Sequence, residues 1–174
     1  MGDLQQFKMN LQDRISKIKW VFTDCDGVLT DGGVYYGEHG EVLKKFNIRD
    51  GMGVERLRKM LEIQTGIITG EMSPSVQKRA EKLQISELHL GIKDKQKCLT
   101  EILEIHHLLP ENIAYIGDDV NDLPVLPLIG IFFCPADALP QVREAADVVL
   151  ALNGGAGCFR EMAEMIIAVK QQIS

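Results

Sequence analysis

Four short motifs carry acidic, hydroxyl and basic side chains that together are able to handle a phosphate ester. They are Asp24-Cys25-Asp26-Gly27, Thr69-Gly70, Lys93-Asp94-Lys95 and Gly117-Asp118-Asp119. Gly27 gives the first motif the backbone freedom that lets both of its carboxylates reach one site. Carboxylates crowded together from two motifs are tolerable only around a cation, and an all-oxygen set of ligands suits Mg2+. We therefore expect a magnesium site where a lysine and a threonine face a phosphate group.

Each motif alone is a weak signal, because DxDG stretches, threonines after strands and lone lysines are common in loops and on surfaces. All four motifs in this order, with each motif at a predicted strand end, rarely arise by accident. A calcium loop counted from Asp24 is excluded, since its sixth position needs Gly and is Leu29, and its twelfth needs Glu and is Tyr35. A receiver domain uses similar residues, but there the paired acids precede the phosphorylated Asp, which is the reverse of the order here.

The motifs follow short apolar runs that alternate with helical periodicity, as in βαβ units of a mostly parallel sheet. The expected strands are 18–23, 64–69, 88–90, 113–116, 131–133 and 148–150, and the segments 33–36 and 42–46 are expected to pair as a hairpin around 37–40. Helical spacing is found in two sets, Leu4, Phe7, Leu11 and Ile15, and Phe159, Met162, Ile166 and Val169. The prediction is an α/β fold with a doubly wound, Rossmann-like parallel sheet, in which ligands bind beyond the carboxyl ends of the strands.

Composition is typical of one folded domain spanning residues 1–174, with 45% hydrophobic and 25% charged residues. The formal net charge of -6 argues against a nucleic-acid or anionic-membrane surface. No apolar run approaches the ~20 residues of a spanning helix, and the polar N-terminus does not resemble a secretory signal. The cysteines form no CxxC pair, so reduced thiols and a cytoplasmic location are expected.

Taken together, the four motifs resemble those of the haloacid dehalogenase superfamily of phosphohydrolases. The resemblance implies that Asp24 is the nucleophile, forming an aspartyl-phosphate, and that Asp26 is the general acid and base. It implies that the Mg2+ ligands are Asp24, the Asp26 carbonyl and Asp118, with Asp119 and Asp122 in support. The implied phosphoryl-binding residues are Thr69, Gly70 and Lys95, with Lys93 and Lys97 as alternatives to Lys95.

A closer resemblance covers nearly the whole chain. The segments 26–32 (DGVLTDG), 46–51 (FNIRDG) and 154–157 (GGAG) with Arg160-Glu161 are similar to 3-deoxy-D-manno-octulosonate 8-phosphate phosphatases, enzymes of lipopolysaccharide biosynthesis. These phosphatases lack a cap domain, and no stretch here is long enough to form one. The resemblance also implies a homotetramer in which the hairpin flap, residues 33–46, meets its copies centrally. Tyr35, Tyr36, Val42 and Phe46 are apolar enough for such contacts, unless they cover the domain's own core.

The resemblance makes the lead function a magnesium-dependent phosphoric monoester hydrolase acting on 3-deoxy-D-manno-octulosonate 8-phosphate. Two departures point elsewhere: Glu71 stands where many of these enzymes carry Arg, and Ala156 where a basic residue is frequent. Glu71 with Lys82 is similar instead to relatives acting on nine-carbon acids, 2-keto-3-deoxynononate 9-phosphate or a sialic acid 9-phosphate. The remaining expected substrate-binding residues are Arg49, Arg79, Asn47, Asp50 and Gly51.

A non-catalytic phosphate-binding or partner-binding module is the alternative from another class. The complete set of Asp24, Asp26, Lys95 and Asp118 argues against it, because a binding module has no need of both a nucleophile and an acid.

Replacing Glu71 with Arg is expected to shift the preference towards the eight-carbon substrate, because a cation attracts the substrate carboxylate that an anion repels. The measurement is the ratio of kcat/KM for the eight-carbon and nine-carbon phosphates in both proteins. Equal ratios before and after the substitution would remove Glu71 from the argument.

Overall fold

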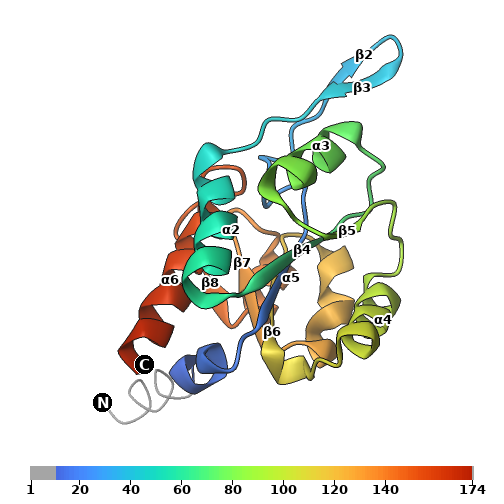
Figure 1. The fold of residues 1–174 in the computed structure, drawn as a ribbon. Coiled ribbons are helices and arrows are strands. Elements are labelled where there is room, and N and C mark those ends of the chain that lie inside the picture. The colour runs from blue at the N-terminus through green and yellow to red at the C-terminus, as the bar shows by residue number, and fades with distance from the viewer. Residues whose placement is uncertain (1–10, 174) are drawn as a thin grey trace.

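The computed structural model describes residues 11–173 and centres on a six-stranded parallel sheet. The strands lie in the order β5-β4-β1-β6-β7-β8 (Figure 1). Their bounds are β1 Trp20–Thr23, β4 Gln64–Ile68, β5 Glu87–His89, β6 Ile113–Ile116, β7 Ile131–Cys134 and β8 Val148–Val149. The chain winds outward from β1 to β5 and returns to the other side of β1 at β6. This is the predicted doubly wound α/β fold, and its strand order reverses beside β1.

Successive residues of the central strands face opposite sides of the sheet and enter two separate hydrophobic cores. Val21 of β1 and Ile116 of β6 belong to the first core, whereas Phe22 and Tyr115 belong to the second. Side chains alternate between faces along a strand, and both faces of this sheet are covered. The strands therefore read in the sequence as continuous apolar runs.

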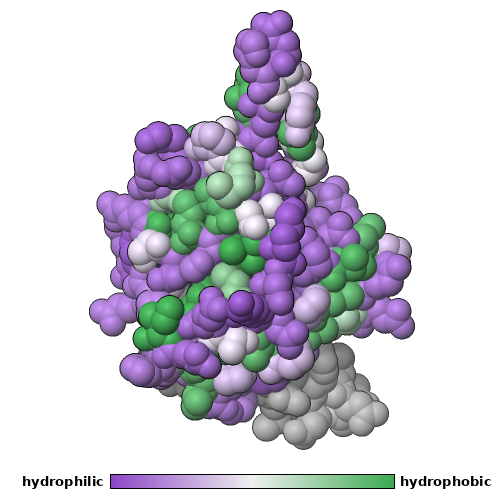
Figure 2. Space-filling view, turned by 90° about the vertical axis from the view of Figure 1, so that its right-hand side faces the viewer, coloured by the Kyte–Doolittle hydropathy of each residue, from purple (hydrophilic) through white to green (hydrophobic). Residues whose placement is uncertain are grey.

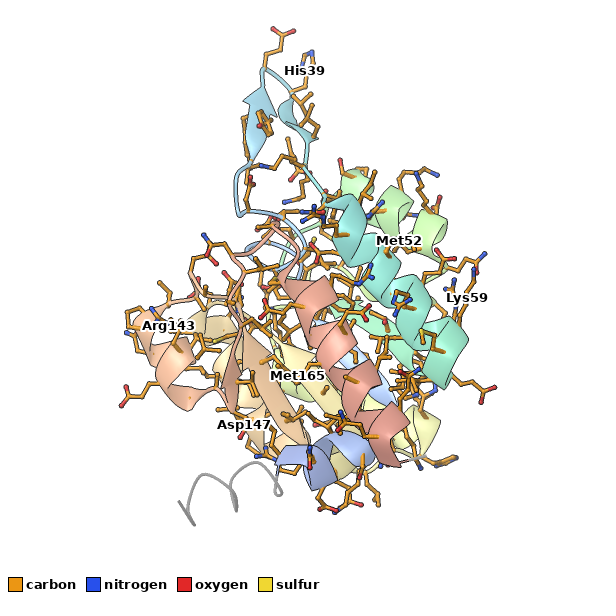
Figure 3. All side chains as sticks on the ribbon, turned by 90° about the vertical axis from the view of Figure 1, so that its left-hand side faces the viewer. His39, Met52, Lys59, Arg143, Asp147 and Met165 are labelled. Atoms are coloured by element: carbon orange, nitrogen blue, oxygen red, sulfur yellow. The ribbon has the colours of Figure 1, made fainter. Side chains whose placement is uncertain are left out.

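Helices cover both faces of the sheet. The first core lies under α2 (Ile48–Leu61), α3 (Pro74–Leu83), α6 (Cys158–Ile173) and the helical residues 11–16. The second lies under α4 (Lys95–His106), α5 (Pro140–Ala145) and the 3-10 helix η2 (Val120–Leu128), while a short 3-10 turn, η1 (Pro110–Asn112), precedes β6. α2 and α6 lie side by side (Figures 1 and 3). The predicted buried face of α6 is confirmed at Phe159, Met162 and Ile166, whereas Leu4 and Phe7 fall outside the described residues.

The hairpin is shorter than predicted. It consists of β2 (Tyr35–Gly37) and β3 (Gly40–Leu43), and it stands clear of the body with His39 at its tip (Figures 2 and 3). The predicted strand 42–46 is wrong over its last three residues, because Lys44 turns a buried side chain back towards the body and Phe46 packs against the first core. Tyr36 is 75% exposed and Val42 61% exposed. Of the four apolar hairpin residues, Phe46 therefore covers the domain's own core.

Other strand boundaries differ from the prediction by one or two residues. β1 begins at Trp20 and not at residue 18, because the amide of Ile18 still donates to the Ile15 carbonyl at 3.2 Å in the turn that closes the preceding helix. β5 is displaced by one residue, and β8 stops at Val149. None of these shifts moves a motif away from its strand end.

The segment between β1 and α2 contains only the hairpin, and residues 11–173 include no cap domain, as predicted. No helix in the described part of the chain is long and apolar enough to cross a membrane.

The glycine-rich segment 154–157 packs directly on the turn that follows β1. A Cβ on Gly154 would lie 1.9 Å from the Gly27 carbonyl oxygen, so only glycine fits there. The amide of Gly155 donates to the Val28 carbonyl at 2.9 Å. The Glu161 carboxylate accepts the amides of residues 151 and 152, each at 2.9 Å. The C-terminal part of the chain thus holds the first motif in place.

Candidate active site

The first and fourth motifs meet where the strand order reverses. Asp24 directly follows β1 and Asp118 comes two residues after β6, its neighbour in the sheet. The Asp24 amide donates to the Ile116 carbonyl at 3.0 Å, which continues the ladder to the end of both strands. Because carboxyl ends of parallel strands meet at one edge of the sheet, the two acids share one site.

Lys95 joins these acids from the first turn of α4. Its Nζ lies 3.1 Å from Asp24 Oδ1 and 2.7 Å from Asp122 Oδ1, and its side chain is 1% exposed. Asp94 caps α4 by accepting the Lys97 amide at 2.9 Å, which fixes the helix start and therefore the position of Lys95. Lys93 and Lys97 line a different hollow beside His89. The structure thus places Lys95 beside Asp24, whereas Lys93 and Lys97 lie outside the site.

Asp122 is fully occupied as a structural partner. Besides Lys95, its Oδ1 accepts the Tyr115 hydroxyl at 2.8 Å, and its Oδ2 accepts the amides of Asp118 and Asp119 at 3.1 and 3.4 Å. A Cβ on Gly117 would lie 2.4 Å from Asp122 Oδ2, so glycine is needed at that position. Asp122 therefore holds Lys95 and the 118–119 backbone in place, which fits its predicted supporting position.

Asp118 is placed against the turn of the first motif. Gly27 adopts a left-handed φ of 85°, and a Cβ there would lie 2.0 Å from Asp118 Oδ2. The predicted backbone freedom of Gly27 is confirmed, and glycine is also required for the close approach of the acid. Among the described residues, Asp118 Oδ1 is one of four buried side-chain oxygens without a hydrogen-bond partner.

The site is electrostatically unbalanced towards negative charge. Burial, with the charge of Asp122, raises the pKa of Asp24 to about 7 even though Lys95 opposes the shift. Burial, with Asp24, Asp122 and Asp119, raises the pKa of Asp118 to about 8. Burial alone would lower the pKa of Lys95, but the two adjacent carboxylates outweigh it and the pKa is raised. One lysine thus does not neutralise the cluster.

These carboxylates fit a divalent cation. Oxygens of Asp24, Asp118 and Asp122 lie within 4.8 Å of one another. Asp122 already accepts from four donors, whereas one buried Asp118 oxygen has no hydrogen-bond partner in the part of the chain that the structure describes. Hard divalent cations such as Mg2+ bind to one or two carboxylates of this kind and keep several waters. Asp119 is exposed and caps η2 by accepting the Val120 amide at 2.6 Å.

The second motif lines the same cavity as the acids. A hollow of about 160 Å³ is lined by Asp24, Asp26, Thr69, Gly70, Glu71, Asp118, Asp119 and Asn121. The Thr69 hydroxyl accepts the Glu71 amide at 3.3 Å, so its hydrogen is free to point elsewhere. A larger hollow of about 510 Å³ lies around Arg14 and Gly130, but Arg14 is bound bidentately to Asp147, labelled in Figure 3.

Several predicted substrate-binding residues lie outside this cavity. Gly51, Arg79 and Lys82 line a separate hollow of about 200 Å³ between α2 and α3, beside Met52 (Figure 3). Arg79 donates to the Asn47 carbonyl at 3.0 Å and lies over the Phe46 ring. Of the predicted substrate group, Glu71 lines the cavity that contains Asp24.

Asn47, Arg49 and Asp50 lie around the start of α2. The Asn47 side chain caps α2 by accepting the Arg49 amide at 2.9 Å and donates to the Gly155 carbonyl at 3.1 Å. Arg49 is exposed near Gly157. Asp50 is 2% exposed and accepts the Arg160 amide at 2.9 Å, and burial raises its pKa to about 6. Asp50 Oδ1 accepts an amide at the start of α6, whereas Asp50 Oδ2 is buried and has no hydrogen-bond partner among residues 11–173, so its role towards a substrate stays a prediction.

Sequence reasoning missed four residues at the site. Tyr115 was hidden in an apolar run, and Asn121 follows the fourth motif without a spacing rule that singles it out. Thr30 and Lys44 both donate to Asp26 Oδ1, at 3.2 and 2.7 Å. Burial would lower the pKa of Lys44, but its hydrogen bonds to Asp26 and Glu41 outweigh burial and raise it. In the sequence Lys44 is the first of two adjacent lysines, and no spacing rule distinguishes it from Lys45.

Comparison with known proteins shows which family the sequence and the fold resemble. A family profile of haloacid dehalogenase-like hydrolases matches residues 87–162. The 3-deoxy-D-manno-octulosonate 8-phosphate phosphatase KdsC of Haemophilus influenzae is 39% identical over 164 residues, covering 94% of this chain and 91% of that protein. The cobalt-bound structure of the H. influenzae phosphatase has a TM-score of 0.88, covering 91% of this chain and 92% of that one.

A third relative is a Moraxella catarrhalis phosphatase of the same name, solved with a magnesium ion, a phosphate ion and a KDO molecule. It is 32% identical, with a TM-score of 0.88, and the match covers 93% of this chain and 92% of the other.

Without a cation, the protein is expected to lose stability as the pH rises from about 4 to about 8. The pKa values of Asp24 and Asp118 are about 7 and about 8 in the folded state against 3.8 ordinarily, so the folded state binds more protons than the unfolded state in this window. The free energy of unfolding must then fall with rising pH. Thermal unfolding in a metal chelator measures this.

At pH 8, Mg2+ at ~100 times the Kd for that pH should stabilise the folded state by about 2.7 kcal/mol. The same Mg2+ concentration should raise the Tm less near pH 5, where protonated carboxyl groups bind the cation more weakly. Asp118→Asn is the control and is expected to flatten the pH slope and remove most of the Mg2+ effect. If the Tm of both proteins followed the same pH dependence and Mg2+ changed neither Tm, this electrostatic account would be contradicted.

Proposed function

Because the chain belongs to the 3-deoxy-D-manno-octulosonate 8-phosphate phosphatases, within the haloacid dehalogenase-like hydrolases, we propose that it removes the terminal phosphate of that eight-carbon sugar acid with Mg2+ bound. The observation that carries the proposal is the meeting of Asp24, Asp118 and Lys95 beyond the ends of two adjacent strands, with one buried Asp118 oxygen that has no hydrogen-bond partner within residues 11–173. A binding module would gain nothing from burying this surplus of negative charge.

Asp24 is proposed as the nucleophile. One carboxylate oxygen attacks phosphorus, the bond from phosphorus to the sugar oxygen breaks, and an aspartyl-phosphate forms. The Cys25 amide at 2.7 Å and Lys95 at 3.1 Å both donate to Asp24 Oδ1, which fixes the orientation of the carboxylate. Lys95 also offsets the repulsion between the carboxylate and the incoming phosphate dianion.

Asp26 is proposed as the general acid and base. It gives its proton to the departing sugar oxygen and then takes a proton from the water that attacks the aspartyl-phosphate. The bond from phosphorus to Asp24 breaks in this second step, releasing inorganic phosphate and restoring both carboxyl groups. Asp26 lines the same cavity as Asp24.

The cation would be held by Asp24, the Asp26 carbonyl and Asp118. When bound, Mg2+ neutralises negative charge on the phosphate oxygens and shields the carboxylate attack. Thr69 and the Gly70 amide, which line the same cavity, would supply hydrogen-bond donors to the phosphoryl group. Asp122 keeps Lys95 and the 118–119 backbone in position.

The nine-carbon acids remain the second candidate, supported by a specific observation. Glu71 is exposed and lines the cavity. An anion at this position is poorly suited to a nearby substrate carboxylate and better suited to hydroxyl groups, of which a nine-carbon acid carries more. Specificity constants for both phosphates, measured side by side, decide between them.

A homotetramer is proposed as the working assembly. The hairpin stands clear of the body (Figure 1) and exposes Tyr35, Tyr36 and Val42, and isolated two-stranded hairpins are only marginally stable in water. Contact between hairpins of neighbouring copies would bury these side chains.

A cytoplasmic location is also proposed. The four cysteines are buried free thiols, which supports it, because disulfides are rare in the reducing cytoplasm.

Asp24→Asn is expected to abolish magnesium-dependent phosphate release, because the amide is a poor nucleophile. Asp26→Asn should lower kcat by about 10²- to 10⁴-fold, the usual contribution of a positioned acid or base, with little change in substrate affinity. Phosphate release from the eight-carbon substrate, with and without Mg2+, is the measurement. Unchanged turnover in Asp26→Asn would show that the acid and base is another residue.

A further inference from the structure

Lys44 is a buried cation that none of the four motifs contains. Its side chain is 0% exposed, although it directly follows the exposed strand β3. Nζ lies 2.7 Å from Asp26 Oδ1 and 3.2 Å from Glu41 Oε2. Burying an ammonium group is unfavourable unless it is paired and hydrogen-bonded, so these two carboxylates hold Lys44 inside.

The two oxygens of Asp26 are in different surroundings. Oδ1 accepts from Lys44 and from the Thr30 hydroxyl at 3.2 Å, and the Gly32 amide donates to the Thr30 oxygen, also at 3.2 Å, which orients that hydroxyl. Oδ2 is buried and has no hydrogen-bond partner among residues 11–173. With two donors already on Oδ1, a proton carried by this carboxyl group belongs on Oδ2.

We propose that Lys44 is the positioning residue of the acid and base: it holds Asp26 by Oδ1, so that Oδ2 exchanges the proton with the sugar oxygen and with water. The inference rests on the proposed phosphatase function and adds a residue to it. Lys44 forms its ion pairs with Asp26 and Glu41 and none with the nucleophile Asp24, so we expect its effect on turnover to pass through Asp26.

The same lysine ties the hairpin to the cavity wall. Glu41 of β3 pairs with Lys44 through one oxygen and accepts the Ser73 hydroxyl through the other. Ser73 precedes α3 and is two residues from Glu71. A continuous set of polar contacts thus runs from Asp26 through Lys44 and Glu41 to the loop that carries Glu71. The orientation of Asp26 therefore depends on the hairpin being in place.

Lys44→Met tests the proposal, because methionine preserves much of the shape and removes the donor. We expect kcat for the sugar phosphate to fall by about 10- to 100-fold, with KM changed by less than about 3-fold. The loss in kcat/KM should be much smaller for p-nitrophenyl phosphate, whose leaving group departs without a proton. Lys45→Met is the matched control: Lys45 is exposed and paired with Asp31, and full activity is expected.

Two further variants separate positioning from simple structural support. Lys44→Arg, which restores a charged donor, should recover most of the lost turnover. In an Asp26→Asn background, Lys44→Met should cause no additional loss, because a residue that acts through another gives non-additive effects. If Lys44→Met does not fold, Lys44→Gln, which keeps an uncharged donor, should show the same dependence on the leaving group.

Equal losses for both phosphate esters, or an undiminished loss in the Asp26→Asn background, would overturn the role of Lys44 while leaving the phosphatase assignment intact. Wild-type protein that hydrolyses neither ester in Mg2+ would instead overturn the proposed function itself.

Discussion

Carboxylate repulsion in a buried site is the constraint on which the rest of this structure depends. Asp24 and Asp118 extend from adjacent strands into a space where burial and mutual repulsion raise both pKa values. Lys95 compensates only in part, and one buried Asp118 oxygen has no hydrogen-bond partner in the described part of the chain. Interactions between charges are strong in such surroundings, so a divalent cation would offset the negative charge that Lys95 leaves uncompensated and would allow a phosphate dianion to approach.

This crowding is possible because glycines occupy the positions where the backbone comes into close contact with an acidic side chain or with another backbone segment. Gly27 lies against Asp118, Gly117 against Asp122, and Gly154 against the Gly27 carbonyl. The contacts of Gly27 with Asp118 and of Gly154 with the Gly27 carbonyl join segments distant in sequence. The first motif is therefore fixed both by the segment that follows β6 and by the C-terminal loop. Such positions hold functional groups rigidly, which is what transition-state stabilisation requires.

The strand ends could be predicted because the signal is local: an apolar run followed directly by a polar motif is visible in a short stretch of sequence. Lys95 was among three close candidates, and only the start of α4 distinguishes it from Lys93 and Lys97. Lys44 could not be predicted, because its burial results from a hairpin folding back over 18 residues to Asp26. The contacts that Arg79 and Asp50 make within the fold, to the Asn47 carbonyl and to an amide at the start of α6, could not be predicted for the same reason.

Crystals grown with Mn2+, which takes the same oxygen ligands as Mg2+ and scatters anomalously, test the shared cation most directly. The account predicts an anomalous peak at about 2.0–2.2 Å from carboxylate oxygens of both Asp24 and Asp118, close to the distances that Mg2+ adopts. A peak bound to other side chains, or no peak in protein that still hydrolyses the phosphate ester, would contradict it.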